Sequence, residues 1–112
     1  MKIYHNPRCS KSRQGLSILA ESRLPFEIIK YLETPLSEIE LTKIIALLNI
    51  DPIDLVRKNE LIWKEKYRNQ QLTDQEIISA MVQNPRLIER PIIINNGKAV
   101  IGRPPEIIKT IL

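Results

Sequence analysis

The chain opens on the stretch "KIYHNPRCSKSRQGLSILAESRLPFEIIKY", residues 2–31, which has the pattern of a strand, a helix and a second strand. Residues 2–4 predict a short strand, and a helix is expected to begin near Cys9 and to end before Pro25. The apolar residues that we expect on its buried face are Leu16, Leu19 and Ala20. Residues 26–31 predict the next strand. A strand–helix–strand unit of this length favours a parallel pair of strands with a right-handed crossover.

The middle of the chain has a helical pattern. Two capping boxes, Ser37-x-x-Glu40 and Thr73-x-x-Glu76, are each followed by apolar residues at helical spacing. Shorter helical segments are predicted between these two helices, one from Asp51-Pro52 towards Arg57 and one over residues 60–68. No repeat, linker or low-complexity segment interrupts the predicted elements.

The end of the chain is strand-like again. Residues 91–94 and 98–101 flank Asn95-Asn96-Gly97, which predicts a β-hairpin, and a last helix is predicted over residues 106–111. The order of elements favours an α/β fold of the thioredoxin-like type, βαβ…ββα, with a helical insertion over about residues 36–84 between its halves. We expect residues 1–112 to form this single domain. We also expect Arg90-Pro91 to be cis, because a cis-proline usually faces the nucleophile in that fold.

Length and composition fit one soluble domain. The 112 residues are 43% hydrophobic, which suffices for a modest core. No apolar run approaches the roughly 18 residues of a membrane span, and no signal-peptide pattern begins the chain, so we expect a cytoplasmic protein with no membrane partner. The net charge of +4 is mild and aromatic residues are only 4%, which disfavours a nucleic-acid partner and favours a local anion site.

Cysteine and histidine each occur once, at Cys9 and His5. One cysteine excludes an intramolecular disulfide, and one residue of each type leaves no metal-ligand cluster of the usual spacing, so we expect no metal site and no bound cofactor. Any redox chemistry at Cys9 must therefore finish with a thiol from another molecule.

Cys9 has the setting of a reactive thiolate. A helix N-terminus and neighbouring cations both lower the pKa of a thiol, and Cys9 is predicted at a helix start between Arg8 and Lys11. His5 could reach back towards the sulfur. The alternatives stay open here: a lone cysteine is often a buried small hydrophobe, and His5 could simply order the loop. The neighbouring cations, Arg13 included, could be solvated surface charges.

Three distal arginines stand at the ends of predicted elements: Arg57, Arg90 and Arg103. Each one alone is more typical of a surface charge. Together they supply what a tetrahedral oxyanion needs, namely planar donor forks matched to a multiply charged oxygen ligand.

The loop His5-Asn6-Pro7-Arg8-Cys9-Ser10-Lys11-Ser12-Arg13 resembles the active-site loop of the glutaredoxin-coupled arsenate reductase family, ArsC-like, and is closest to a branch of short bacterial members. The similarity continues in order along the chain, in four further blocks: Tyr31-Leu32-Glu33-Thr34-Pro35, Val56-Arg57-Lys58-Asn59, Glu89-Arg90-Pro91-Ile92 and Ile101-Gly102-Arg103-Pro104-Pro105-Glu106.

This resemblance implies an oxidoreductase that reduces arsenate to arsenite. Cys9 would attack arsenate, glutathione as co-substrate would resolve the covalent adduct, and glutaredoxin as partner would reduce the mixed disulfide that remains. His5 would help to lower the pKa of Cys9, and Ser12 could donate a hydrogen bond to the thiolate. The oxyanion would be held by Arg57, Arg90 and Arg103. We expect a monomer.

Two other functions compete with this one. A Spx-type regulator that binds RNA polymerase would share the fold, but its usual switch is Cys-x-x-Cys, and this chain has Cys9-x-x-Ser12. A glutathione-dependent monothiol oxidoreductase that acts on disulfides would use Cys9 but would not need all three arginines.

Overall fold

The computed structural model describes all 112 residues and divides the chain into two compact units. The first unit is discontinuous and consists of Met1–Thr34 and Arg90–Leu112, while the second is Pro35–Glu89. The second unit overlaps the segment over which the sequence predicts a helical insertion, about residues 36–84. No helix has both the length and the apolar character that crossing a membrane would require.

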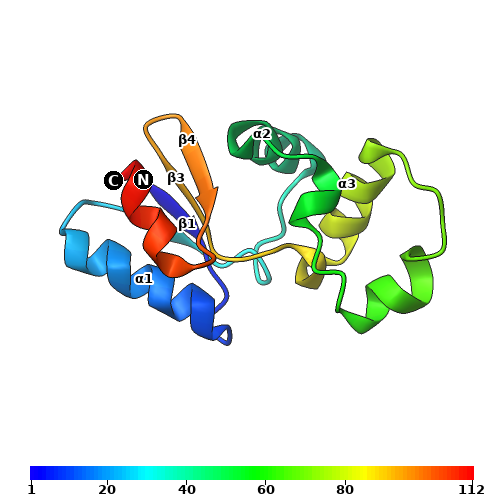
Figure 1. Ribbon diagram of the computed structural model, residues 1–112, viewed down its shortest axis with the longest axis horizontal. Helices are drawn as coiled ribbons and strands as arrows, with labels where there is room; N and C mark the ends of the chain where they lie inside the picture. The colour runs from blue at the N-terminus through cyan, green and yellow to red at the C-terminus, as the bar shows by residue number, and fades with distance from the viewer. The chain divides into compact units, whose positions relative to one another are not determined.

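The first unit contains a four-stranded sheet in the order β2-β1-β3-β4, which gives the predicted βαβ…ββα arrangement (Figure 1). Its strands are β1 (Lys2–Tyr4), β2 (Glu27–Ile29), β3 (Ile92–Asn95) and β4 (Lys98–Ile101). β1 pairs in parallel with β2 and antiparallel with β3, and β3 pairs antiparallel with β4. The predicted hairpin is confirmed, because Asn96 and Gly97 both adopt positive φ angles, 51° and 74°, in its turn.

Two helices accompany this sheet, α1 (Ser10–Ser22) and the 3₁₀ helix η4 (Pro105–Ile111), and they pack against each other. The core between these elements is formed by Ile3, Leu19, Ile93 and Ile108, all fully buried. Three details differ from the sequence prediction. Ala20 is exposed, because the buried residues of α1 are Ser12, Gly15 and Leu19 and the next residue points away from that face. β2 is shorter than residues 26–31, and the last helix has 3₁₀ geometry, which suits a short terminal piece.

The second unit is helical. It contains α2 (Glu38–Leu48), η1 (Pro52–Leu55), η2 (Trp63–Tyr67), α3 (Asp74–Gln83) and η3 (Pro85–Leu87). Both predicted capping boxes are formed, by Ser37 with Glu40 and by Thr73 with Glu76. The segment predicted as helical over residues 60–68 contains a π-helical turn, in which Trp63 stacks on Tyr67 with ring centroids 5.6 Å apart. α3 ends at Gln83, with Asn84 as its C-cap, and Pro85 follows, a residue that cannot continue the helix.

Candidate active site

Cys9 is the N-cap residue of α1. Its backbone is extended, with φ −96° and ψ 123°, and its carbonyl oxygen accepts the first helical hydrogen bond from Arg13 N–H at 2.9 Å. The Cys9 N–H donates to the carbonyl oxygen of Asn6 at 3.0 Å, which closes the loop that leads into the helix. The thiol is half-buried, so Cys9 is not the fully buried hydrophobe that composition alone would favour. Cys9 therefore lies at the N-terminus of α1, the positive end of the helix dipole.

The register of the sheet explains how two distant arginines reach this loop. Tyr4, the last residue of β1, pairs with Ile92, the first residue of β3, and Ile92 pairs with Ile101, the last residue of β4. The segments that follow β1, precede β3 and follow β4 therefore meet at the same end of the sheet, where these three strands end or begin. These segments carry Cys9, Arg90 and Arg103 respectively.

Arg103 connects the two other members of this group. Its Nε donates to the carbonyl oxygen of Arg90 at 2.7 Å, and its Nη2 donates to Cys9 Sγ at 3.4 Å. Arg90 is buried, with 8% of its surface exposed, and it directly precedes Pro91. The Arg90-Pro91 peptide bond is cis, as expected, and so is Arg103-Pro104, which was not predicted. The guanidinium of Arg103 is thus held through two of its nitrogens, Nε and Nη2.

The environment lowers the pKa of Cys9. Burial acts first and in the opposite sense, because it disfavours the charged thiolate. It is outweighed by the backbone N–H of Ser12, by a hydrogen bond from Arg90 and by the positive charges of Arg103 and Arg90. A lowered pKa increases the thiolate fraction at neutral pH, and the thiolate is the nucleophilic form of cysteine.

Ser12 uses its side chain and its backbone for different partners. Its hydroxyl oxygen lies 2.6 Å from His5 Nδ1 and accepts a hydrogen bond from the Asn6 N–H at 3.0 Å. Burial, followed by the charges of Lys30 and Arg13, lowers the pKa of His5 despite an opposing hydrogen bond with the Ser12 backbone, so the ring is neutral at neutral pH. In a neutral ring that carries its proton on Nε2, Nδ1 accepts a hydrogen bond from the Ser12 hydroxyl. The group of Ser12 that lowers the pKa of Cys9 is its backbone N–H.

His5 is 4% exposed and is not among the groups that set the pKa of Cys9. Its side chain contacts Ser12 within the loop that carries Cys9. The nearby cations also differ from one another. Arg8 is exposed. Arg13 Nη1 donates to the carbonyl oxygen of Pro7 at 3.0 Å, an exposed hydrogen bond that links the first turn of α1 to the loop.

Asn6 is the loop residue to which sequence reasoning gave no role. It is 5% exposed, and it holds three neighbours: its Oδ1 accepts from Arg8 N–H at 3.0 Å, its carbonyl accepts from Cys9 N–H, and its own N–H donates to Ser12. The signal was present, because asparagine before proline is typical of a side-chain-capped turn.

The third predicted oxyanion donor, Arg57, lies in the helical unit. Its Nη1 donates to Glu89 Oε1 at 3.0 Å, and its Nε donates to Glu60 Oε1 at 3.4 Å. Sequence reasoning did not anticipate either carboxylate partner.

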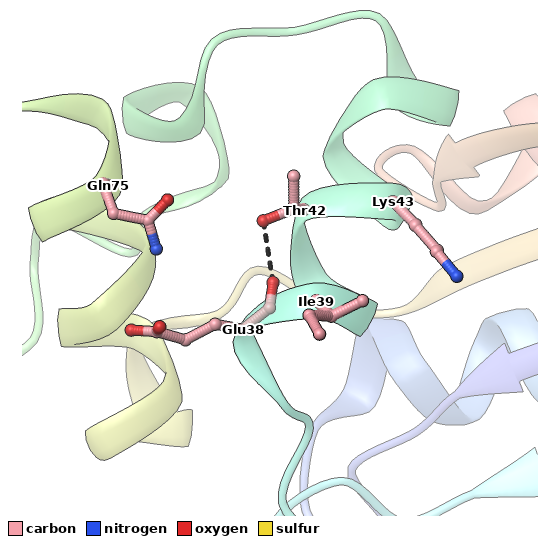
Figure 2. Close-up of a pocket in the computed structure, with 5 residues that line it drawn as sticks. All are labelled: Glu38, Ile39, Thr42, Lys43 and Gln75. Atoms are coloured by element: carbon pink, nitrogen blue, oxygen red, sulfur yellow. Dashed lines mark hydrogen bonds between the residues drawn. The ribbon is translucent and has the colours of Figure 1, made fainter.

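A separate hollow in the helical unit contains none of the predicted residues. Figure 2 shows its lining, which comes from Glu38, Ile39, Thr42 and Lys43 of α2 and from Gln75 of α3. It has no nucleophilic thiol, and the only hydrogen bond among these side chains is local, from Thr42 Oγ1 to the Glu38 carbonyl at 2.7 Å. No group of three or more His, Cys, Asp or Glu side chains could hold a metal ion anywhere in the chain. The loop around Cys9 is therefore the candidate site.

The sheet topology and a half-buried cysteine of lowered pKa at the head of α1 define a thioredoxin-like protein. The ArsC family model matches residues 4–111, and the chain belongs to the ArsC family. It is 46% identical over 108 residues to "Uncharacterized protein YfgD" of Escherichia coli (strain K12), covering 95% of this chain and 91% of that protein. It is 41% identical to an arsenate reductase of Neisseria meningitidis serogroup A, covering 100% and 97%. The structure of an arsenate reductase from Vibrio cholerae superposes with a TM-score of 0.94 at 42% identity, covering 100% and 98%.

Proposed function

We propose that this protein is an arsenate reductase that works with glutathione and glutaredoxin in the cytoplasm. The observation that carries the proposal is the contact of Arg103 Nη2 with Cys9 Sγ at 3.4 Å, since it joins a nucleophile to a donor for its anionic substrate. Relatives named arsenate reductase, at about 40% identity over nearly the full length of this chain, support the choice of substrate.

In the proposed reaction the Cys9 thiolate attacks arsenate, a sulfur–arsenic bond forms, and one arsenate oxygen leaves as water. The thiolate of glutathione then attacks the Cys9 sulfur. The sulfur–arsenic bond breaks with its electron pair on arsenic, which leaves as arsenite, while the two sulfurs become a mixed disulfide. Glutaredoxin reduces this disulfide by thiol exchange and regenerates Cys9. The external thiols are required because the chain has one cysteine.

The residues of the site have distinct proposed roles. The backbone N–H of Ser12, with Arg90 and Arg103, stabilises the thiolate, and the two guanidinium groups also bind oxygens of the oxyanion. His5 positions Ser12 through the short contact between their side chains. We assign Arg57 as a further oxyanion donor because it matches the family motif.

The test is arsenite formation by the purified protein with arsenate, glutathione and glutaredoxin. We expect turnover by the parent and none by the Cys9→Ser variant, with circular dichroism confirming that both are folded. Arsenite formation by the variant would contradict the covalent mechanism. A parallel assay replaces arsenate with a small mixed disulfide of glutathione. Turnover of the disulfide alone would identify a monothiol oxidoreductase instead.

A further inference from the structure

Two of the three glycines of the chain, Gly15 and Gly102, lie against the same side chain, that of Pro91. Neither has a positive φ angle, since Gly97 in the hairpin turn is the only glycine that does. Backbone conformation therefore does not explain glycine at either position. Gly15 also lies inside α1, where glycine is less favourable than alanine because it loses more conformational freedom on folding. The feature that both positions share is the lack of space for a side chain.

A larger residue at either position would press on the Pro91 ring. A Cβ atom at Gly15 would lie 2.9 Å from Pro91 Cγ, and a Cβ atom at Gly102 would lie 2.8 Å from the same atom. Carbon atoms pack at about 3.5–4.0 Å, so either Cβ would force a displacement of roughly 0.6 Å or more. Ile108 Cδ1 borders the same space, at 3.1 and 3.0 Å from the two Cβ positions, and both Ile108 and Pro91 are fully buried. The ring is therefore enclosed.

The Pro91 ring is connected to both arginines of the Cys9 site through the backbone. Pro91 directly follows Arg90, and Gly102 directly precedes Arg103. The Gly102 N–H donates to the Pro91 carbonyl at 2.8 Å. Arg103 Nε donates to the Arg90 carbonyl at 2.7 Å. A displacement of the ring is therefore transmitted to the two segments that carry the guanidinium groups.

Gly15 brings the helix that carries the thiol to the same ring. Cys9 is the N-cap residue of α1, and Gly15 lies on the buried face of that helix. Arg103 Nη2 lies 3.4 Å from Cys9 Sγ, so this distance depends on how closely α1 approaches Pro91. The groups of a reactive site have to be held within about 0.5 Å of their productive geometry, which is less than the displacement that one Cβ would cause.

We infer that Gly15 and Gly102 are positioning residues for the Cys9 site, because their lack of a side chain lets the Pro91 ring pack against both α1 and the residue that follows β4. Gly102 sets the distance between the segments of the two arginines, and Gly15 sets the distance of the thiol from both segments. Neither glycine is assigned a contact with substrate, and each acts through Pro91. The inference rests on the proposed function in that Arg90 and Arg103 serve the thiol and its oxyanion.

The test measures the pKa of Cys9 from thiolate absorbance as a function of pH, with circular dichroism confirming that each variant is folded. Gly15→Ala and Gly102→Ala should each raise this pKa, because the added methyl group separates the sulfur from the arginines or the arginines from each other. The thiolate-to-thiol ratio at neutral pH should fall by about threefold or more. In the arsenate assay, kcat/KM should fall by about tenfold or more. Helix propensity alone predicts the opposite sign for Gly15→Ala, namely a more stable α1 with an unchanged thiol.

Two matched controls isolate the contact with Pro91. Gly97→Ala makes the same substitution in the hairpin turn, where the new Cβ meets nothing within 4 Å but the φ of 74° strains it, so that it reports the effect of lost stability alone. Ser17→Ala raises helix propensity at an exposed residue of α1. Both controls should keep the pKa and the turnover of the parent. A shift in either control as large as that in Gly15→Ala would overturn the inference.

Ile108→Val distinguishes Pro91 from the other neighbour of the two glycines. It removes Cδ1, the Ile108 atom nearest to a Cβ at Gly15, but keeps the 2.9 Å approach to Pro91 Cγ. Gly15→Ala should therefore raise the pKa of Cys9 in this background as well, and loss of the effect would refute the route through Pro91.

The pKa and the turnover assay report on different claims. If the parent reduces arsenate but the pKa of Cys9 is unchanged in folded Gly15→Ala and Gly102→Ala, the inference is refuted and the proposed function stands. If the pKa rises in both variants but the parent does not reduce arsenate, the proposed function is refuted and the positioning role of the glycines stands.

Discussion

Arg103 Nη2 lies 3.4 Å from Cys9 Sγ, although 94 residues separate them in the chain. The same side chain is anchored through Nε on the carbonyl oxygen of Arg90 at 2.7 Å. One guanidinium therefore serves the thiolate and the backbone that positions the second arginine.

Arg103→Lys should raise the pKa of Cys9. Lysine keeps the positive charge but has one nitrogen, so it cannot bond to the Arg90 carbonyl and the Cys9 sulfur in the geometry of a planar fork. The pKa is measured from thiolate absorbance at 240 nm as a function of pH. Lys109→Ala, which removes an exposed cation of η4, serves as the control and should leave the pKa unchanged. A Cys9 pKa equal to that of the parent in Arg103→Lys would mean that charge alone, without the fork, sets the thiolate.

Ser12→Ala should reduce stability more than it changes the pKa of Cys9. The variant loses the hydroxyl that serves His5 Nδ1 and Asn6 N–H, and leaving these buried groups without that partner costs about 1–3 kcal/mol. The backbone N–H that acts on the sulfur is retained. Urea unfolding measures the first effect, and thiolate absorbance measures the second. A large rise in the Cys9 pKa with unchanged stability would show that the hydroxyl, and not the backbone, serves the thiolate.

Stability should fall as the pH is lowered through the range in which His5 titrates. Burial and the nearby charges of Lys30 and Arg13 lower the pKa of His5 in the folded protein, so the unfolded chain binds this proton more readily. The contribution is fully present above the unfolded value of about 6.5 and is lost as the pH falls through the lower folded value. Urea unfolding at several pH values between 7.5 and 5 should show a steeper loss in the parent than in His5→Gln. Parallel curves would exclude His5 as the source.

Thr73→Ala should destabilise the helical unit without affecting the thiol. Thr73 Oγ1 accepts from the Glu76 N–H at 3.2 Å, and Glu76 Oε1 accepts from the Thr73 N–H at 3.0 Å. Loss of such a cap costs about 0.5–2 kcal/mol. Hydrogen exchange should localise the loss to α3, and the pKa of Cys9 should equal that of the parent. A shifted thiol pKa would reveal energetic coupling between α3 and the loop.

The parts of the fold that depend on local chemistry were predictable. Capping boxes at Ser37 and Thr73 and the turn at Asn96-Gly97 each use side chains or φ angles within a few residues, and each is confirmed. The short extent of β2 and the exposure of Ala20 could not be predicted, because tertiary packing decides them. The π-helical turn of η2 has no periodic signal of its own.

The candidate site shows the same division. Cys9 at a helix start could be read from its neighbours, and the resemblance to a family singled out Arg90 and Arg103. The contact of the Ser12 hydroxyl with His5, in place of the expected bond to the Cys9 thiolate, could not be predicted. It depends on which way a buried hydroxyl turns. The pairing of Arg57 with Glu89 depends on a bridge between segments 32 residues apart.

The discontinuity of the first unit has a consequence for synthesis on the ribosome. The strand β1 is made first, but its antiparallel partner β3 and the residue Arg103 come only after the whole of Pro35–Glu89. At typical elongation rates the interval between Tyr4 and Ile92 lasts roughly 4–20 s, whereas the helical unit is contiguous and needs no distant partner. Throughout that interval Cys9 lacks the charges of both arginines, which lower the pKa of its thiol in the folded protein. Cys9 therefore gains its neighbours Arg90 and Arg103 only after the helical unit and β4 have been made.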